Sequence, residues 1–330
     1  MLLKNQKYLV VGGITMDVIC LADIKKVNLN NSKTSDKGIY IKFSSKTPLK
    51  DFKLDFGGSA ANSAVALSRV GNKVDLLSCV GTDYFGYASI KNIKDFGVST
   101  KLVKRKGQKT GFGIAIITPD GEKSVLVYRG SNDNLSINDI SEKEIIGVDA
   151  VFITSMVSKE NFVLFKRVLS ICNKNNKTVI FAPSISMIRD YKKEIKKLES
   201  FFDISIMNIE EARYYTSKFD IKDVIKDLPG IVRVVSADVD GAYAYDGDRI
   251  LKIGIVPLKV IDSTGAGDTF SACFCSEFLK TNSIERALGF ATMCASLKVN
   301  HIGARFNKSL REVEFAYKKY KRYLKVKGLL

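Results

Sequence analysis

Hydrophobic and polar positions follow two alternating periods along the chain. Short apolar runs rich in β-branched residues predict strands at 8–11, 74–80, 150–154, 178–182, 203–207 and 231–236. Between these runs, apolar residues recur every three or four positions, which predicts helices at 60–70, 86–95, 159–175, 188–199 and 209–216. Three more helices are predicted at 268–280, 284–299 and 309–324. Alternating strands and helices indicate an α/β fold of three layers, α/β/α, around a mostly parallel sheet.

Two segments depart from this alternation. Residues 18–56 and 101–128 contain strand-like runs and turns but no convincing helix, with a turn at 118–121. We therefore expect one domain over residues 1–330, with a small β lid formed by about 18–56 and 101–128.

Composition narrows the class of protein. The formal net charge is +17, but the lysines are scattered, which favours a solvated basic surface over a nucleic-acid interface. No apolar run approaches the roughly 18 residues of a membrane span, and the first residues read as a strand and not as a signal peptide. The six cysteines form no C-x-x-C pair, which is typical of free thiols in a reducing compartment. We expect a cytoplasmic protein without nucleic-acid or membrane partners.

A single histidine, His301, limits the chemistry. One imidazole cannot build a multi-histidine zinc site, and no G-x-S-x-G motif accompanies it. Acid–base catalysis near neutral pH would therefore use carboxylates.

The most informative segment is 261–270, a glycine-rich turn that leads directly into a helix. Small residues at a helix start leave backbone N–H groups free to bind an anion such as phosphate. Asp268 would be unfavourable beside an anion unless it acts as a general base; the alternative is a plain helix cap. No P-loop motif occurs, and no G-x-G-x-x-G opens a helix.

The stretch 264–270, Thr-Gly-Ala-Gly-Asp-Thr-Phe, resembles the C-terminal signature of the ribokinase-like carbohydrate kinases, the PfkB family. Further matching motifs occur in family order at 11–17, 56–66, 80–86, 130–135 and 208–211. The resemblance covers essentially the whole chain. It implies a ribokinase-like fold and an ATP-dependent phosphotransferase that acts on an alcohol group of a small molecule.

The resemblance also implies roles for individual residues. The catalytic group would comprise Asp268 as the base, with Gly265, Ala266 and Gly267 as the anion hole. The substrate site would comprise Asp17, Gly57, Gly58, Asn62 and Arg129. The ATP site would comprise Asn208, Ser236, Asp238, Gly241 and Gly267. Mg²⁺ would be held through water by Glu211, and a monovalent cation such as K⁺ by Asp262, the carbonyl of Thr264 and the loop after His301.

Several of these residues have simpler alternative roles. Asp17 could cap a turn, Asn62 could be a neutral helix residue, and Glu211 could be a solvated carboxylate. A homodimer through the lid is also an expectation from the resemblance.

The family pattern is not followed everywhere. Asp238 replaces a glycine of the T-x-G-x-x-G stretch, Ala182 replaces an acid or amide, and Met156 stands where ribose kinases carry glutamate. Tyr128-Arg129 resembles acid-sugar and fructose kinases, whereas 57–62 resembles archaeal nucleoside kinases. The expected substrate is a sugar or sugar derivative; the alternatives are a nucleoside kinase and a ligand-binding relative with weak catalysis.

Overall fold

The computed structural model describes residues 5–31, 34–119 and 123–329. Within them, a ten-stranded sheet has the order β16-β15-β14-β13-β12-β11-β10-β1-β6-β7. Its strands are β1 (Lys7–Val11), β6 (Lys73–Val80), β7 (Val103–Arg105), β10 (Ala150–Ile153), β11 (Thr178–Phe181), β12 (Ile204–Asn208), β13 (Val232–Ser236), β14 (Ala242–Tyr245), β15 (Ile250–Ile253) and β16 (Lys327–Leu329). The strands from β7 to β13 pair in parallel, and the pairs from β13 to β16 are antiparallel.

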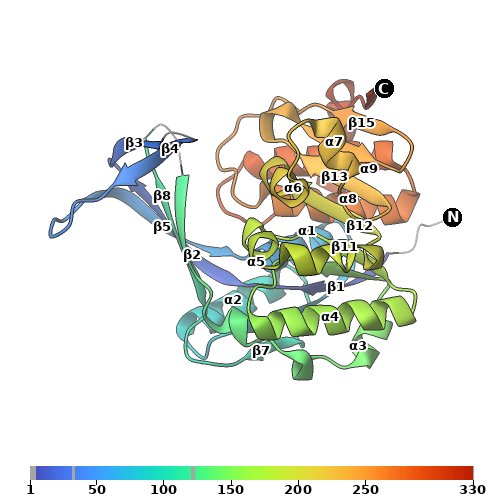
Figure 1. Cartoon of the computed structure of the whole chain (residues 1–330), viewed down its shortest axis with the longest axis horizontal. Helices are drawn as coiled ribbons and strands as arrows, with labels where there is room; N and C mark the ends of the chain where they lie inside the picture. The colour runs from blue at the N-terminus through green and yellow to red at the C-terminus, as the bar shows by residue number, and fades with distance from the viewer. Residues whose placement is uncertain (1–4, 32–33, 120–122, 330) are drawn as a thin grey trace.

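Helices cover both faces of this sheet (Figure 1). They are α1 (Ser59–Arg69), α2 (Tyr84–Asp95), α3 (Glu142–Ile146), α4 (Lys159–Lys174), α5 (Ile185–Lys196), α6 (Ile209–Thr216), α7 (Ile221–Lys226), α8 (Ala266–Thr281), α9 (Ile284–Val299) and α10 (Leu310–Lys319). Successive residues of β1 point to opposite faces. Val10 packs in the core beneath α1, α8 and α9, and Leu9 packs in the core beneath α4 to α7. The predicted three-layer α/β/α fold is confirmed.

A second, four-stranded sheet projects from the main domain (Figure 1). Its order is β5-β2-β8-β9, with bounds β5 (Leu49–Gly57), β2 (Thr15–Ala22), β8 (Gly111–Ile117) and β9 (Lys123–Tyr128). The hairpin β3 (Lys25–Asn31) and β4 (Thr34–Tyr40) extends it. We call this second sheet, with its hairpin, the lid.

The boundaries differ in detail from the expected ones. β7 falls inside the range 101–128 expected for the lid, but it pairs in parallel with β6 in the main sheet. The short helices α3 and α7 and the antiparallel strands β14 to β16 are not predicted, because each is too short to show a clear period. The turn expected at 118–121 lies partly outside the described residues. In the part of the chain that is described, no helix has the length and apolarity needed to cross a membrane.

Candidate active site

The start of α8 has the backbone geometry of an anion site. Gly265 adopts φ +77°, and a Cβ there would lie 2.2 Å from the carbonyl oxygen of Ala304, so only glycine fits. A Cβ on Gly267 would meet no atom within 4 Å. Packing within the protein therefore does not require glycine at 267, and the space beside it is open to a ligand. The first N–H groups of α8 have no partners within the helix, although that of Ala266 donates to the carbonyl of Ser263 at 3.1 Å. The start of the helix can therefore bind an anion beside Gly267.

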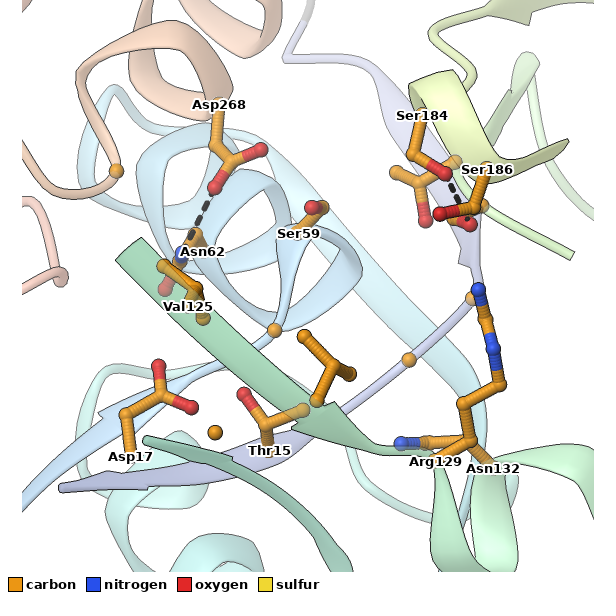
Figure 2. A pocket seen from close by; sticks show the side chains of 18 of the residues that line it. Thr15, Asp17, Ser59, Asn62, Val125, Arg129, Asn132, Ser184, Ser186 and Asp268 are labelled. Carbon is orange, nitrogen blue, oxygen red and sulfur yellow. Dashed lines mark hydrogen bonds between the residues drawn. The ribbon is translucent and has the colours of Figure 1, made fainter. Parts of the chain in front are cut away.

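Asp268 lies in the first turn of α8 and is oriented by Asn62. The amide nitrogen Nδ2 of Asn62 donates to Oδ2 of Asp268 at 2.7 Å, as Figure 2 shows. Burial raises the pKa of Asp268 from 3.8 to about 6, against the opposing effects of the Asn62 hydrogen bond and the positive charge of Arg305. A carboxylate with this pKa is mostly ionised at neutral pH and is a better proton acceptor than an exposed aspartate.

Three neighbouring cavities share lining residues near the start of α8. The first, of about 340 Å³, lies beneath the lid and is lined by Asp17, Gly58, Asn62, Arg129 and Asp268 among others. The third, of about 120 Å³, is bordered by Asp268, Gly267, Ser236, Asn208 and Glu211. The second, of about 380 Å³, is bordered by Gly267, Ser236, Ala266, Asp238 and Gly241. Asp268 borders the first and third cavities, and Gly267 and Ser236 border the third and second. A continuous series of sites thus leads past Asp268 and the start of α8.

The first cavity has two chemically different sides (Figure 2). Asp268, Asn62 and Asp17 lie along one side, and Arg129, Asn132, Ser184 and Ser186 lie along the other. Met156, which stands at the position of the glutamate of ribose kinases in the family pattern, adds an apolar side chain to the lining.

Asp17 is accommodated by glycines on both neighbouring strands. A Cβ on Gly57 of β5 would lie 1.9 Å from an Asp17 carboxylate oxygen, and one on Gly113 of β8 would lie 2.6 Å from the other. Gly57, predicted to bind substrate, is not among the residues that line the cavity; it makes room for Asp17. Burial raises the pKa of Asp17, although a hydrogen bond from Thr15 opposes the shift.

Arg305 is a site residue that sequence reasoning missed. Its side chain is buried, with Nη1 donating to Oδ1 of Asn62 at 2.6 Å and Nη2 donating to the carbonyl of Gly57 at 3.2 Å. Burial lowers the pKa of Arg305 to about 10, and the carboxylates of Asp55, Asp268 and Asp17 oppose that shift. Arg305 follows Gly303-Ala304 in the loop after His301, a loop already expected to contribute to the site, and this position is the sequence feature that could have identified it.

Asp55, also missed, lies directly opposite Asp17 in the β2–β5 pairing. One of its carboxylate oxygens accepts the backbone N–H of Ala304 at 2.9 Å, which joins the lid to the loop that carries Arg305. The carboxylates of Asp17, Asp55 and Asp268 therefore all act electrostatically on one buried guanidinium.

Asn208 and Glu211 form the capping box of α6. Oδ1 of Asn208 accepts the Glu211 N–H at 2.8 Å, and Oε2 of Glu211 accepts the Asn208 N–H at 2.9 Å. Burial raises the pKa of Glu211 to about 7. Among the described residues no cluster of three acidic, histidine or cysteine side chains could hold a metal by itself. Mg²⁺ usually needs only one or two carboxylates beside waters and phosphates, so Glu211 at the edge of the third cavity fits it.

The loop at 236–241 borders the second cavity. Asp238 adopts φ +43° and Gly241 adopts φ +89°, so the position where Asp238 departs from the family pattern still has a glycine-like backbone. The Asp238 side chain is exposed. Val256, Val260 and Phe270 supply an apolar lining suited to a planar base.

Asp262, expected to bind a monovalent cation, accepts hydrogen bonds from three other residues. Its Oδ1 accepts the N–H of Thr264 and its Oδ2 accepts the N–H of Gly303, both at 2.9 Å. Its carbonyl oxygen accepts the Lys298 ammonium at 2.8 Å. Burial would raise the pKa of Asp262, but these backbone hydrogen bonds lower it overall. Thr264 borders the first cavity, where its Oγ1 lies 3.5 Å from Lys123 Nζ.

Residues 6–310 match the model of a family described as pfkB family carbohydrate kinase. Ribokinase of Bacillus subtilis (strain 168) is 29% identical over 252 residues, which cover 75% of this chain and 82% of the relative. 5-Dehydro-2-deoxygluconokinase of Clostridium botulinum (strain Eklund 17B / Type B) is 27% identical over 299 residues, covering 83% and 87%. ATP-dependent ribose-1-phosphate kinase of Halopiger xanaduensis is 28% identical over 256 residues, covering 76% and 82%.

Solved structures share the fold. The Arabidopsis thaliana ribokinase complexed with ribose and ATP superposes with a TM-score of 0.78 at 20% identity, covering 96% of this chain and 99% of that one. A putative ribokinase II from E. coli in complex with ATP and Mg²⁺ gives a TM-score of 0.76 at 18% identity, covering 96% and 100%.

Proposed function

Because the chain belongs to the pfkB family of carbohydrate kinases, phosphotransferases with an alcohol acceptor, we propose that it transfers the terminal phosphoryl group of ATP to a hydroxyl of an anionic sugar derivative. The observation that carries the proposal is the position of Asp268, which borders both the first and the third cavity beside the open start of α8. A hydroxyl in the first cavity and a phosphoryl group in the third would meet at this carboxylate.

The chemistry follows from this placement. Asp268 accepts the proton of the substrate hydroxyl as the hydroxyl oxygen bonds to the terminal phosphorus and the bond from that phosphorus to the ADP oxygen breaks. The backbone N–H groups at residues 265–267 stabilise the charge on the transferring group. Asn208 and Glu211 would hold Mg²⁺ through water, and the ion would neutralise phosphate charge. The second cavity would take the base and ribose of ATP.

The proposed substrate class rests on the two sides of the first cavity. Asp17 is suited to accept hydrogen bonds from sugar hydroxyls, while Arg129 places positive charge on the opposite side of the cavity. Lys123 also lines the cavity, but it lies beside Thr264 and acts on Asp17. Asp133 also lines the wall and interacts with Arg129, so it balances part of that charge. A substrate with hydroxyls at one end and a carboxylate or phosphate at the other would match both sides. Two relatives support this choice by their names, which refer to a gluconate derivative and to ribose-1-phosphate.

We predict that sugar acids or sugar phosphates react with higher kcat/KM than the matching neutral sugars and nucleosides under Mg-ATP. Arg129→Ala should raise KM for the anionic substrate by about tenfold or more, because a charge-assisted hydrogen bond typically contributes about 1.5–3 kcal/mol. KM for a neutral sugar should change little. Arg167→Ala, at an exposed position of α4, is the matched control. Equal kcat/KM for neutral and anionic substrates would contradict the proposal, and a clear preference for a nucleoside would favour that alternative.

We also propose that two copies associate through the lid. The strand registers place Leu54, Leu126 and Tyr128 on the lid face opposite Asp17, where these residues are 51%, 63% and 54% exposed. Clustered exposed apolar side chains are typical of an interface.

Leu126→Asp should therefore convert a dimer to a monomer in light scattering, because a carboxylate in an apolar interface is costly. The control is Val163→Asp, which alters an exposed apolar residue of α4 away from the lid. A wild-type protein that is monomeric at micromolar concentration would refute this association.

A further inference from the structure

Lys298, in the last turn of α9, has a fully buried side chain with 0% of its surface exposed. Lysine is almost never buried in this way unless its charge is paired. The structure gives it a partner: Nζ donates to the backbone oxygen of Asp262 at 2.8 Å. The carboxylates of Asp262 and Asp55 provide compensating negative charge nearby.

The loop that Lys298 contacts leads directly into the anion-binding turn. The carbonyl of Val299 accepts the N–H groups of Ile261 and Asp262 at 2.7 and 3.1 Å, so the end of α9 also holds the loop immediately before the ammonium contact. The Asp262 carboxylate then fixes Thr264 and Gly303 by accepting their N–H groups. The position of the turn at 265–267 thus depends on a short chain of contacts that begins at Lys298.

The family resemblance had predicted an inorganic monovalent cation at this loop, on Asp262 and the carbonyl of Thr264. The described residues do not suit a second cation there, because an ammonium already occupies the Asp262 carbonyl. The ammonium groups of Lys53 and Lys123 on the lid add further positive charge that acts on the Lys298 ammonium. Like charges in a partly buried site repel strongly, since screening by water is weak there.

We propose that Lys298 supplies, as a fixed part of the chain, the positive charge that orders the loop at 262–264, so that the enzyme needs no inorganic monovalent cation. This inference rests on the proposed kinase function for its activity readout. Nucleotide affinity and thermal stability provide readouts that do not require turnover.

The first experiment compares KCl, NaCl and tetramethylammonium chloride at about 100 mM, where the ionic strength and the screening are equal. For the wild-type protein, kcat/KM and the calorimetric Kd for Mg-ATP should differ by less than about twofold between the salts. Tm should differ by less than about 2 °C. A rise of about tenfold in kcat/KM or in affinity specific to K⁺ would overturn the proposal.

The second experiment uses Lys298→Met, which keeps an unbranched apolar stem and removes the charge. Affinity for Mg-ATP and kcat/KM should fall by about tenfold or more, and KCl or NH₄Cl should restore part of the loss where tetramethylammonium does not. Lys280→Met, in the last turn of α8 and partly exposed, is the matched control. Unchanged nucleotide affinity in Lys298→Met would refute the inference.

Two further outcomes are separable. If Lys298→Met does not fold, the salt series on the wild-type protein decides the question by itself. If the wild-type protein transfers no phosphoryl group to any acceptor, the proposed function fails, while the salt dependence of Mg-ATP binding and Tm still tests the role of Lys298.

Discussion

Asp268→Asn is expected to lower kcat by about a hundredfold or more while leaving substrate and Mg-ATP affinity within a few-fold of wild type. Asparagine preserves the shape of the side chain but cannot accept the substrate proton. In the wild-type enzyme, kcat/KM should rise as the pH increases through about 6, because the pKa of Asp268 lies there and only the ionised form is a base. Steady-state rates and calorimetric Kd values test both parts.

The same substitution should stabilise the protein at high pH. The pKa of Asp268 is raised from 3.8 to about 6, so the folded state binds this proton more tightly than the unfolded state. Above pH 6 the buried charge therefore costs folding free energy, on the order of 1–3 kcal/mol, which asparagine avoids. The gain in Tm should disappear below about pH 4, where Asp268 is protonated in both states.

Asp262→Asn controls for the loss of a carboxylate at the same turn. The pKa of the Asp262 carboxyl is lowered in the folded protein, so the ionised carboxylate favours folding. Removal of this carboxylate should therefore destabilise the protein at neutral pH. Retention of more than about a tenth of wild-type kcat by Asp268→Asn would contradict the general-base role.

The sequence predicts the parts of this site that depend on local chain geometry. Gly265 and Asp268 lie within one turn-and-helix segment, so their spacing alone indicates an anion site beside a carboxylate. The parallel strands are also predicted, because strands buried on both faces are nearly continuous apolar runs. The local turn does not reveal how Asn62 orients Asp268, because the two residues are 206 positions apart and meet only when α1 packs on α8.

The buried cations could not be predicted for the same reason. Arg305 and Lys298 are two of 52 basic residues, and composition does not distinguish a buried cation from an exposed one. Gly57 illustrates a different difficulty. Its sequence context predicts a substrate site, whereas the space that it leaves for the Asp17 side chain on the neighbouring strand can be seen only in the structure.

Arg305→Gln is expected to shift the rise of kcat/KM with pH to higher pH and to lower activity at pH 7 by about twofold or more, because a rise of about one pKa unit from about 6 halves the ionised fraction of Asp268 at pH 7. The guanidinium favours the ionised forms of Asp268 and Asp17, so its removal raises both pKa values. Glutamine is shorter than arginine, so it removes the contact between Nη1 and Oδ1 of Asn62 together with the charge.

The pH profile separates this electrostatic role from a structural one. A residue that only holds Asn62 in place would lower kcat/KM equally at every pH, whereas loss of the Arg305 charge should be largely recovered at pH 9, where Asp268 and Asp17 ionise again. Arg305→Lys keeps the charge and should retain a nearly wild-type profile, with a lower maximum because the two-pronged contact to Asn62 and Gly57 is lost. Arg311→Gln, at an exposed position of α10, is the control. A uniform loss across pH in Arg305→Gln would show that Arg305 positions Asn62 and does not tune the base.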